Sequence, residues 1–592
     1  MRTLRSQGLT AIVALSMVLT ACSGGEEDGS TAGTIPGATG SGGGTGSGGT
    51  GVTPPTAQAT NLIETELDAA RFLSRATFGG SKSDIASLTG RDAADWMASE
   101  FSKSTSLTMP QILAQPRNSN GDLPGQRINE LYWDHIIGAN DQLRQRMAFA
   151  LSQILVYSDA ADSDQPMRGT YQDILIRNAF GNYRQLLEDV TYSSAMGEWL
   201  TYRGNRKGDP RRGRMPDENY AREILQLFSI GLIELNLDGT PRLDGSGQQI
   251  ETYTNADIEG LARVFTGLSW AGGEFFREPQ DGNIQPMQMY PEQHSELEKV
   301  FLGTTIPAGT PGIESIDTAL DVIFEHPNVA PFISRQLIQR FTQSDPAPAY
   351  VENVARAFES GSFTAAGGRR FGTGQRGDLQ ATLAAVLLEP TLFVEPADNV
   401  TVAVGKVREP ILRFTHWARA FDVDGLNAAN ERSLRDTRSS DNALGQQAFR
   451  SPSVFNFYRP GYVAPGTNAG EQNITVPEFQ IVNESSSVGY LNFMTDFAFD
   501  RASQRDRNIE TYKPDYSAEL ALVDDPQALV DHLDNLLTGG RMAAAEKADI
   551  VDIVSTIAVR TNNPENTAAD QEDKVQTAVT LVLNSPSFAV VW

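Results

Sequence analysis

Cysteine and histidine are scarce in this sequence, with one cysteine and five histidines among 592 residues. A disulfide needs two cysteines, so the chain has no disulfide framework and no cluster of cysteine ligands for a metal. The single cysteine is Cys22. Any histidine-based metal site must draw on five side chains, so each of them can be weighed separately.

The start of the chain lacks a hydrophobic run long enough for an ordinary transmembrane helix. Its apolar stretch, residues 8–21, has about 14 residues, which is short for a hydrocarbon core of ~30 Å and typical of a signal peptide. The stretch ends in Leu19-Thr20-Ala21-Cys22, which resembles a bacterial lipobox, in which the cysteine is acylated. We therefore expect residues 1–21 to be a lipoprotein signal peptide and Cys22 to carry the lipid. The alternative is a plain secretory signal that leaves a free thiol.

A lipid on Cys22 would place the protein in the cell envelope, either periplasmic or surface-exposed. Ser23 follows the cysteine where an aspartate would direct retention in the inner membrane, so the familiar sorting rule favours the outer membrane. Residues 22–61 are rich in Gly, Ser, Thr and Pro, which predicts a disordered tether. Such a tether separates the body of the protein from its lipid by roughly 30–40 Å.

Basic residues are also in short supply. The chain has 48 Lys and Arg against 74 Asp and Glu, which gives a net charge of −26. Removal of Arg2 and Arg5 with the signal peptide makes it −28. Because this charge repels phosphate backbones and anionic lipid, we expect no nucleic-acid partner and attachment to the membrane through the lipid.

The remaining chain is dominated by amphipathic segments with helical spacing. They predict a mainly α, multi-helical body of two lobes, residues 62–424 and 425–592, because just over 500 residues exceed one usual core. A few short β-hairpins are expected as well. The clearest is at residues 236–254, where two Asp-Gly pairs lie among alternating residues.

Two neighbouring segments concentrate polar residues beside apolar ones. The first, PDENYAREILQLFSIG at residues 216–231, predicts a helix that begins at the N-cap Asp217 and ends at Gly231. The second, residues 252–270, predicts a helix that begins with a capping box of Thr254 and Asp257. We expect these two helices to pack against each other.

These segments resemble the DUF1800 family of large bacterial envelope proteins. The resemblance runs from about residue 62 to the C-terminus. It rests on the motifs ATFGG (76–80), DENYAREILQLFSIG (217–231), ADIEGLARVFTGLSW (256–270), HPNVAPFISRQLIQRF (326–341), FRSPSVFNFYRPGY (449–462) and PEFQIVN (477–483). The family name records no established activity. Members look often to be encoded beside sulfatase-like DUF1501 proteins, so the resemblance implies such a protein as a partner. Ser152 and Ile154 stand where many members carry a histidine pair in a segment of the form WHNHF.

Candidate catalytic residues come from the first helix and from two histidines. They are Glu223, Arg222, His294 and His326. A buried glutamate suits proton transfer, but an Arg-carboxylate lock is the simpler role for this pair. Two histidines with Glu223 or Glu296 suit a divalent metal, although no HExxH or HxH spacing is present. The simpler role for His326 is a backbone contact at a helix start, and the sequence identifies no metal site and no cofactor.

Candidate ligand-binding residues lie on both helices, namely Asn219, Tyr220, Arg263 and Trp270. An aromatic loop at residues 453–462 adds a surface that is either core or a platform for sugar rings, which makes polysaccharide a candidate partner. Two hypotheses follow. The protein is a surface-tethered binding or scaffold protein that works with secreted partners, or it is a hydrolase or metal-assisted enzyme acting on an envelope or extracellular polymer.

Overall fold

The computed structural model describes residues 61–160, 164–394, 405–423, 434, 436–502 and 512–591. The predicted signal peptide, Cys22 and nearly all of the predicted tether lie outside these residues. So does the predicted lobe boundary at residues 424–425, and residues 57–592 group into one compact unit, so the division into two lobes stays a prediction. None of the described helices is long and apolar enough to cross a membrane.

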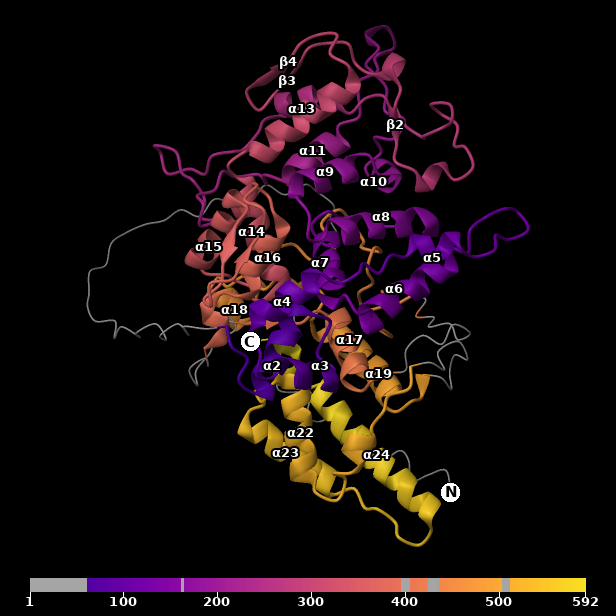
Figure 1. Cartoon of the computed structure of the whole chain (residues 1–592), viewed down its shortest axis with the longest axis vertical. Coiled ribbons are helices and arrows are strands. Elements are labelled where there is room, and N and C mark those ends of the chain that lie inside the picture. The colour runs from indigo at the N-terminus through magenta and orange to yellow at the C-terminus, as the bar shows by residue number, and fades with distance from the viewer. Residues whose placement is uncertain are drawn as a thin grey trace. The chain divides into compact units, whose positions relative to one another are not determined.

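The described part of the chain is mainly helical, as predicted (Figure 1). The helices of its first half are α2 (Glu66–Ala76), α3 (Lys82–Leu88), α4 (Ala93–Phe101), α5 (Met109–Leu113), α6 (Gln126–Gly138), α7 (Gln142–Ser152), α8 (Gln165–Asn178), α9 (Tyr183–Thr191), α10 (Ser194–Trp199), α11 (Asn219–Gln226) and α12 (Asn255–Val264). Those of its second half are α13 (Gly312–Glu325), α14 (Val329–Phe341), α15 (Pro348–Ser360), α16 (Leu379–Leu387), α17 (Pro410–Ala420), α18 (Asn468–Glu471), α19 (Glu484–Ala498), α21 (Ser517–Leu520), α22 (Pro526–Thr538), α23 (Ala544–Ser555), α24 (Pro564–Leu583) and α25 (Pro586–Ala589). Short 3-10 helices are η1 (Pro210–Arg212), η2 (Gly282–Ile284), η3 (Pro291–Gln293), η4 (Pro390–Phe393) and η6 (Pro477–Gln480).

Strands occur as short antiparallel pairs. They are β1 (Leu268–Ser269) with β2 (Gln288–Met289), β3 (Lys299–Phe301) with β4 (Thr304–Ile306), β5 (Phe363–Thr364) with β6 (Arg370–Phe371), and β7 (Lys406–Val407) with β8 (Val590–Val591). The predicted hairpin region has isolated bridges, Leu235 with Pro241 and Leu243 with Gln249, one around each Asp-Gly turn. This confirms the prediction made for residues 236–254.

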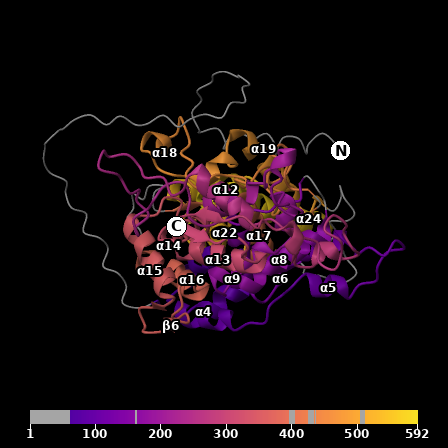
Figure 2. The same ribbon diagram turned by 90° about the horizontal axis from the view of Figure 1, so that it is seen from above.

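Helix α7 lies at the centre of the core. Every one of its residues is buried, and α4, α6, α8 and α14 pack around it. At the lower end in Figure 1, the C-terminal helices α22 to α24 pack together, and α22 contacts both α2 and α17. The view from above places α18 and α19 on one side and α4 on the opposite side (Figure 2). The β7–β8 pair joins the last described residues to the segment before α17.

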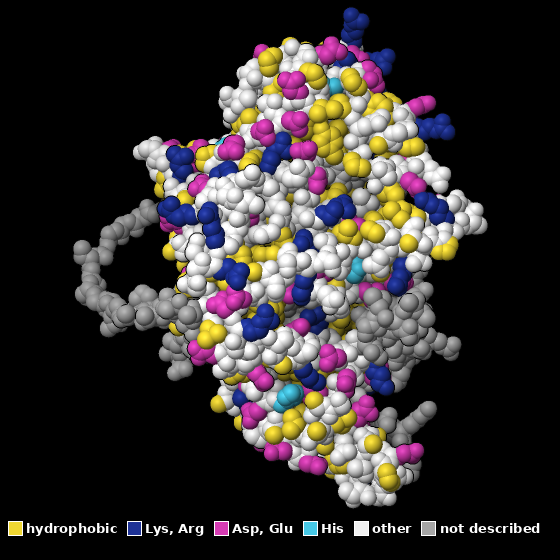
Figure 3. Space-filling model, in the orientation of Figure 1, with side chains coloured by type: hydrophobic (Ala, Val, Ile, Leu, Met, Phe, Trp, Pro, Cys, Tyr) yellow, Lys and Arg dark blue, Asp and Glu magenta, His cyan; other side chains and the backbone are white. Residues whose placement is uncertain are grey.

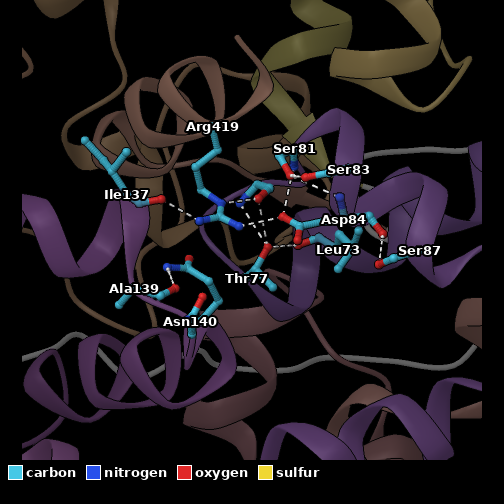
Figure 4. A network of polar contacts seen from close by, with 12 residues as sticks. Leu73, Thr77, Ser81, Ser83, Asp84, Ser87, Ile137, Ala139, Asn140 and Arg419 are labelled. Atoms are coloured by element: carbon cyan, nitrogen blue, oxygen red, sulfur yellow. Dashed lines mark hydrogen bonds and ion pairs between the residues drawn. The ribbon is translucent and has the colours of Figure 1, made fainter. Parts of the chain in front are cut away.

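Arg419 of α17 holds the segment ATFGG, which follows α2, close to α17 (Figure 4). Its guanidinium donates to the carbonyl oxygens of Gly79 at 2.6 Å and Ile137 at 2.5 Å, and to the carboxylate of Asp84 at 2.7 Å. Gly79 has φ +111°, and a Cβ atom on it would lie 2.5 Å from the backbone of His416. Only glycine allows this approach between the segment after α2 and the side of α17.

Candidate functional site

Helices α11 and α12 pack against each other, as predicted. The ring of Tyr220 on α11 meets the ring of Phe265, at the end of α12, edge to face with centroids 4.7 Å apart. The capping box of α12 is also present, because the carboxylate of Asp257 accepts hydrogen bonds from the amide and the hydroxyl of Thr254, both at 2.7 Å. The two segments singled out in the sequence therefore form one packed unit.

The predicted limits of the first helix were wrong. Helix α11 begins at Asn219, two residues after the predicted N-cap Asp217, whose carboxylate accepts the Asn219 amide at 2.9 Å. It ends at Gln226 because the amide of Phe228 bonds at 3.1 Å to the carbonyl oxygen five residues earlier, which widens the last turn. Gly231 does adopt the left-handed conformation, with φ +70°, but beyond the helix.

Glu223 and Arg222 share α11 without forming an ion pair with each other. Arg222 pairs with Glu218 at 3.4 Å, the predicted partner four residues earlier. Glu223 is half-buried, and its Oε2 has no hydrogen-bond partner among the described residues. Burial raises the pKa of Glu223, and the positive charge of Arg222 opposes this shift. Burial likewise raises the pKa of neighbouring Tyr253 to about 12.

His294 lies after η3, against the end of α12. Its Nδ1 donates a hydrogen bond to the carbonyl oxygen of Thr266 at 2.8 Å. Its Nε2 is buried and has no partner among the described residues. Burial lowers the pKa of His294, which favours the neutral ring.

His326 lies elsewhere, at the end of α13, where its Nδ1 accepts the amide of Asn328 at 3.2 Å. This is the backbone contact that the sequence favoured for it. No hydrogen bond or ion pair in the described part of the chain joins Glu223 to either histidine. The same residues contain no group of three His, Cys, Asp or Glu placed to hold a metal ion.

Of the candidate ligand-binding residues, Tyr220 is a core residue. It is 1% exposed, its hydroxyl shares a hydrogen bond with that of Thr191 at 2.7 Å, and its ring stacks on Tyr202 with centroids 4.1 Å apart. Asn219 is exposed and donates to the hydroxyl of Thr201 at 2.9 Å. Packing is therefore the role of Tyr220, whereas Asn219 lies at the surface.

Arg263 lies in the last turn of α12, and Trp270 directly follows β1. Arg263 donates to the carbonyl oxygen of Glu298 at 3.3 Å. Trp270 is 5% exposed, and the guanidinium of Arg203 stands 3.6 Å from its ring centroid. Trp270 therefore packs against Arg203, which begins a loop that was not predicted to be functional from the sequence.

That loop, residues 203–214, connects α10 to α11 and is called the basic loop here. It carries six basic side chains and one acidic one, Asp209: Arg203, Arg206, Lys207, Arg211, Arg212 and Arg214. In a chain of net charge −26, this reversal of sign was the sequence signal that would have revealed it. Among the described residues, three of these arginines form no ion pair: Arg206, Arg211 and Arg214.

The basic loop is fixed to the segment that follows α12. The amide of Lys207 donates to the carbonyl oxygen of Gln293 at 2.7 Å, and its ammonium pairs with Glu296 at 3.0 Å. Arg206 stands 5.0 Å from the ring centroid of Phe276, which is 68% exposed. Figure 3 shows Lys and Arg side chains projecting at the top of the view, over the region of this loop. The basic loop and Phe276 together are called the interaction surface below.

A second group of residues missed from the sequence lies in the core. Arg146 of α7, Arg340 of α14 and Glu409, just before α17, are each at most 1% exposed. Arg146 donates to the backbone carbonyl oxygen of Arg340, and the hydroxyl of Tyr458 donates to Oε2 of Glu409 at 3.0 Å. The sequence signal for this group was Arg146 itself, a charged residue within a largely apolar helical segment. The aromatic loop thus contributes Tyr458 to the core.

Comparison with known families gives one finding. The model of the family described as a protein of unknown function (DUF1800) matches residues 71–590, which is nearly the whole chain. No curated protein and no solved structure matches.

Proposed function

The chain belongs to the DUF1800 family, and we propose that it is a cell-envelope lipoprotein that acts as a surface-tethered binding or scaffold protein for secreted partners. The lipid on Cys22 holds it to the outer membrane. The Gly/Ser-rich tether lets the body reach a partner roughly 30–40 Å from the anchor.

The observation that carries this proposal is the interaction surface. Guanidinium groups bind carboxylate, sulfate and phosphate with paired hydrogen bonds. Arg206, Arg211 and Arg214 have no ion pair among the described residues, although Arg214 donates from Nε and Nη2 to the carbonyl oxygen of Lys207 at 3.2 and 3.1 Å. Their positive charge is therefore not neutralised within the loop. Phe276 adds an exposed aromatic ring, a residue type enriched at interfaces. A partner that presents anionic groups fits this surface.

A direct binding assay tests the proposal. The full chain, purified in detergent, is titrated with a DUF1501-type protein from the same organism, the partner that the family resemblance implies. Reversal of two charges, Arg211→Glu with Arg214→Glu, raises Kd about tenfold or more, because attraction becomes repulsion. Arg356→Glu on α15 is the control, since Arg356 is an exposed arginine that lies outside the loop. If the wild type, the double variant and Arg356→Glu bind the partner with equal affinity, the interaction surface does not bind it.

Glu223 favours a second candidate function, a hydrolase that acts on an envelope or extracellular polymer. A half-buried carboxyl whose pKa is raised suits a general acid, and its Oε2 is buried without a hydrogen-bond partner among the described residues. The assay is polymer hydrolysis by the wild type and by Glu223→Gln. Loss of hydrolysis in the variant, with unchanged stability, supports the hydrolase function. If neither protein hydrolyses the polymer, this function is ruled out.

A further inference from the structure

The buried arginines Arg146 and Arg340 have donors that nothing in the described structure satisfies. For each of them, Nε and Nη1 are buried without a hydrogen-bond partner. Neither arginine forms an ion pair within the described residues. Phe341 lies 4.5 Å from the guanidinium of Arg146, and Tyr458 lies 4.8 Å from that of Arg340. Such ring contacts stabilise a cation without satisfying its N–H groups.

Glu409 is the carboxylate that lies among the contacts of these two arginines. It is bonded to Gln153, whose carbonyl oxygen accepts from Arg340 at 3.5 Å, and to Tyr458, whose ring Arg340 faces. Its Oε2 accepts hydrogen bonds from the side-chain amides of Gln153 and Gln446 and from Tyr458. Its Oε1 is buried without a partner. The group therefore combines unsatisfied cationic donors with one unsatisfied carboxylate oxygen.

These unsatisfied atoms are costly unless something binds them. A buried polar group without a partner costs about 1–3 kcal/mol, and a charged one costs more. Two buried guanidiniums without an ion pair favour a negative charge beside them. Guanidiniums bind oxyanions in particular, because the spacing of their N–H groups matches the oxygens of carboxylate and phosphate.

A small cavity lies beside the same group. Gln153 and Gln446, which hold Glu409, line it, and so does Phe149, whose ring centroid lies 5.7 Å from the guanidinium of Arg146. The cavity has room for about one water molecule. Ser152, at the position where many family members carry a histidine, also lines it.

The wall opposite α7 is formed by residues 446–457, part of the segment 446–458 that we call the covering segment. Two of its non-glycine residues have left-handed backbones, Phe449 with φ +59° and Asn456 with φ +62°. Such conformations are strained for a bulky residue like phenylalanine and cluster at ligand sites and switch regions. Arg146 and Arg340 do not themselves line the cavity, so a ligand in it reaches them only if this segment shifts.

We propose that Arg146 and Arg340 bind the oxyanion group of a small ligand, a carboxylate or a phosphate, and that Glu409 Oε1 accepts a hydrogen bond from a hydroxyl or ammonium group of the same ligand. The covering segment moves to admit the ligand. This site is independent of the interaction surface, and each can fail while the other holds.

Thermal unfolding of the full chain in detergent tests the site. Sodium acetate and sodium phosphate serve as probes, with sodium chloride at matched ionic strength as the reference. One of the oxyanions raises Tm in a saturable manner, and the one that acts identifies the ligand group as carboxylate or phosphate. Arg340→Gln weakens this binding about tenfold or more, because a hydrogen-bonded charge is lost. Arg144→Gln leaves this binding unchanged; Arg144 is another buried arginine, on helix α7, which also carries Arg146.

Two further measurements apply if Arg340→Gln does not fold. Glu409→Gln removes a competing negative charge and strengthens oxyanion binding. A high-resolution crystal structure grown in the oxyanion that raised Tm shows that ion on Arg146 and Arg340. The inference is overturned if neither oxyanion raises Tm above the chloride reference, or if the crystals hold only water at these arginines.

Discussion

The hydroxyl of Tyr458 donates a hydrogen bond to Oε2 of Glu409 across 3.0 Å, and both residues are almost fully buried. Tyr458 comes from the motif FRSPSVFNFYRPGY, while Glu409 precedes α17. The bond thus holds the covering segment on the core.

Replacement of Tyr458 by phenylalanine removes this donor and leaves a buried carboxylate with one partner fewer. A hydrogen bond to a charged group contributes about 1.5–3 kcal/mol, so the free energy of unfolding falls by about that amount. Urea denaturation measures it. Tyr462→Phe is the control, because Tyr462 is half-buried and makes no side-chain hydrogen bond in the described structure. Equal losses for the two variants would contradict the prediction.

Gly79→Ala tests the close approach between the ATFGG segment and α17. The new Cβ would lie 2.5 Å from the backbone of His416, and φ is +111°, so the contact cannot relax by a rotamer change. We expect the free energy of unfolding to fall by clearly more than about 1 kcal/mol. Gly90→Ala is the matched control, since Gly90 also has positive φ but its Cβ would meet open space. It costs only about 1 kcal/mol.

The sequence predicted local features well and long-range contacts poorly. The capping box of Thr254 and Asp257 and the two Asp-Gly turns depend on residues a few positions apart, and all were confirmed. The packing of α11 on α12 followed from their apolar faces. Helix limits failed where a wider last turn replaced the expected glycine stop.

The buried group of Arg146, Arg340 and Glu409 could not be predicted in this way. Its members come from three helical regions far apart in the chain, and no spacing links them. Conversely, Glu223, His294 and His326 share a chemistry that suggested one site, yet the fold gives them separate environments.

Asp173 provides a pH prediction. It accepts the amides of Thr108 at 2.8 Å and Met109 at 2.9 Å, but burial raises its pKa from 3.8 to about 6. A raised pKa in the folded state means that the native protein binds the proton more tightly, so its contribution to stability is present below pH ~3.8 and is lost as pH rises toward ~6. The total change is up to roughly 3 kcal/mol.

Urea denaturation of the wild type and of Asp173→Asn across this pH window measures the effect. The wild type loses stability relative to the variant as pH rises, because asparagine does not titrate. A difference that stays constant with pH, or that grows in favour of the wild type, would show that Asp173 keeps an ordinary pKa.

Cys22→Ser tests the anchor. The wild-type protein is expected to fractionate with the outer membrane and to have an intact mass that includes acyl chains on Cys22. The variant cannot be acylated, so it should lose the lipid mass and leave the membrane fraction. A variant that stays in the membrane fraction would disprove attachment through this lipid.

The most direct measurement of the central claim is site-specific photo-crosslinking in living cells. A photoreactive amino acid replaces Phe276, which is 68% exposed in the interaction surface, or Val488 on α19, which is 61% exposed elsewhere. The account predicts one discrete adduct with a secreted protein from position 276, absent from position 488 and lost on reversal of Arg211 and Arg214. Identical adducts from both positions, or an adduct at 276 that survives the charge reversal, would contradict it.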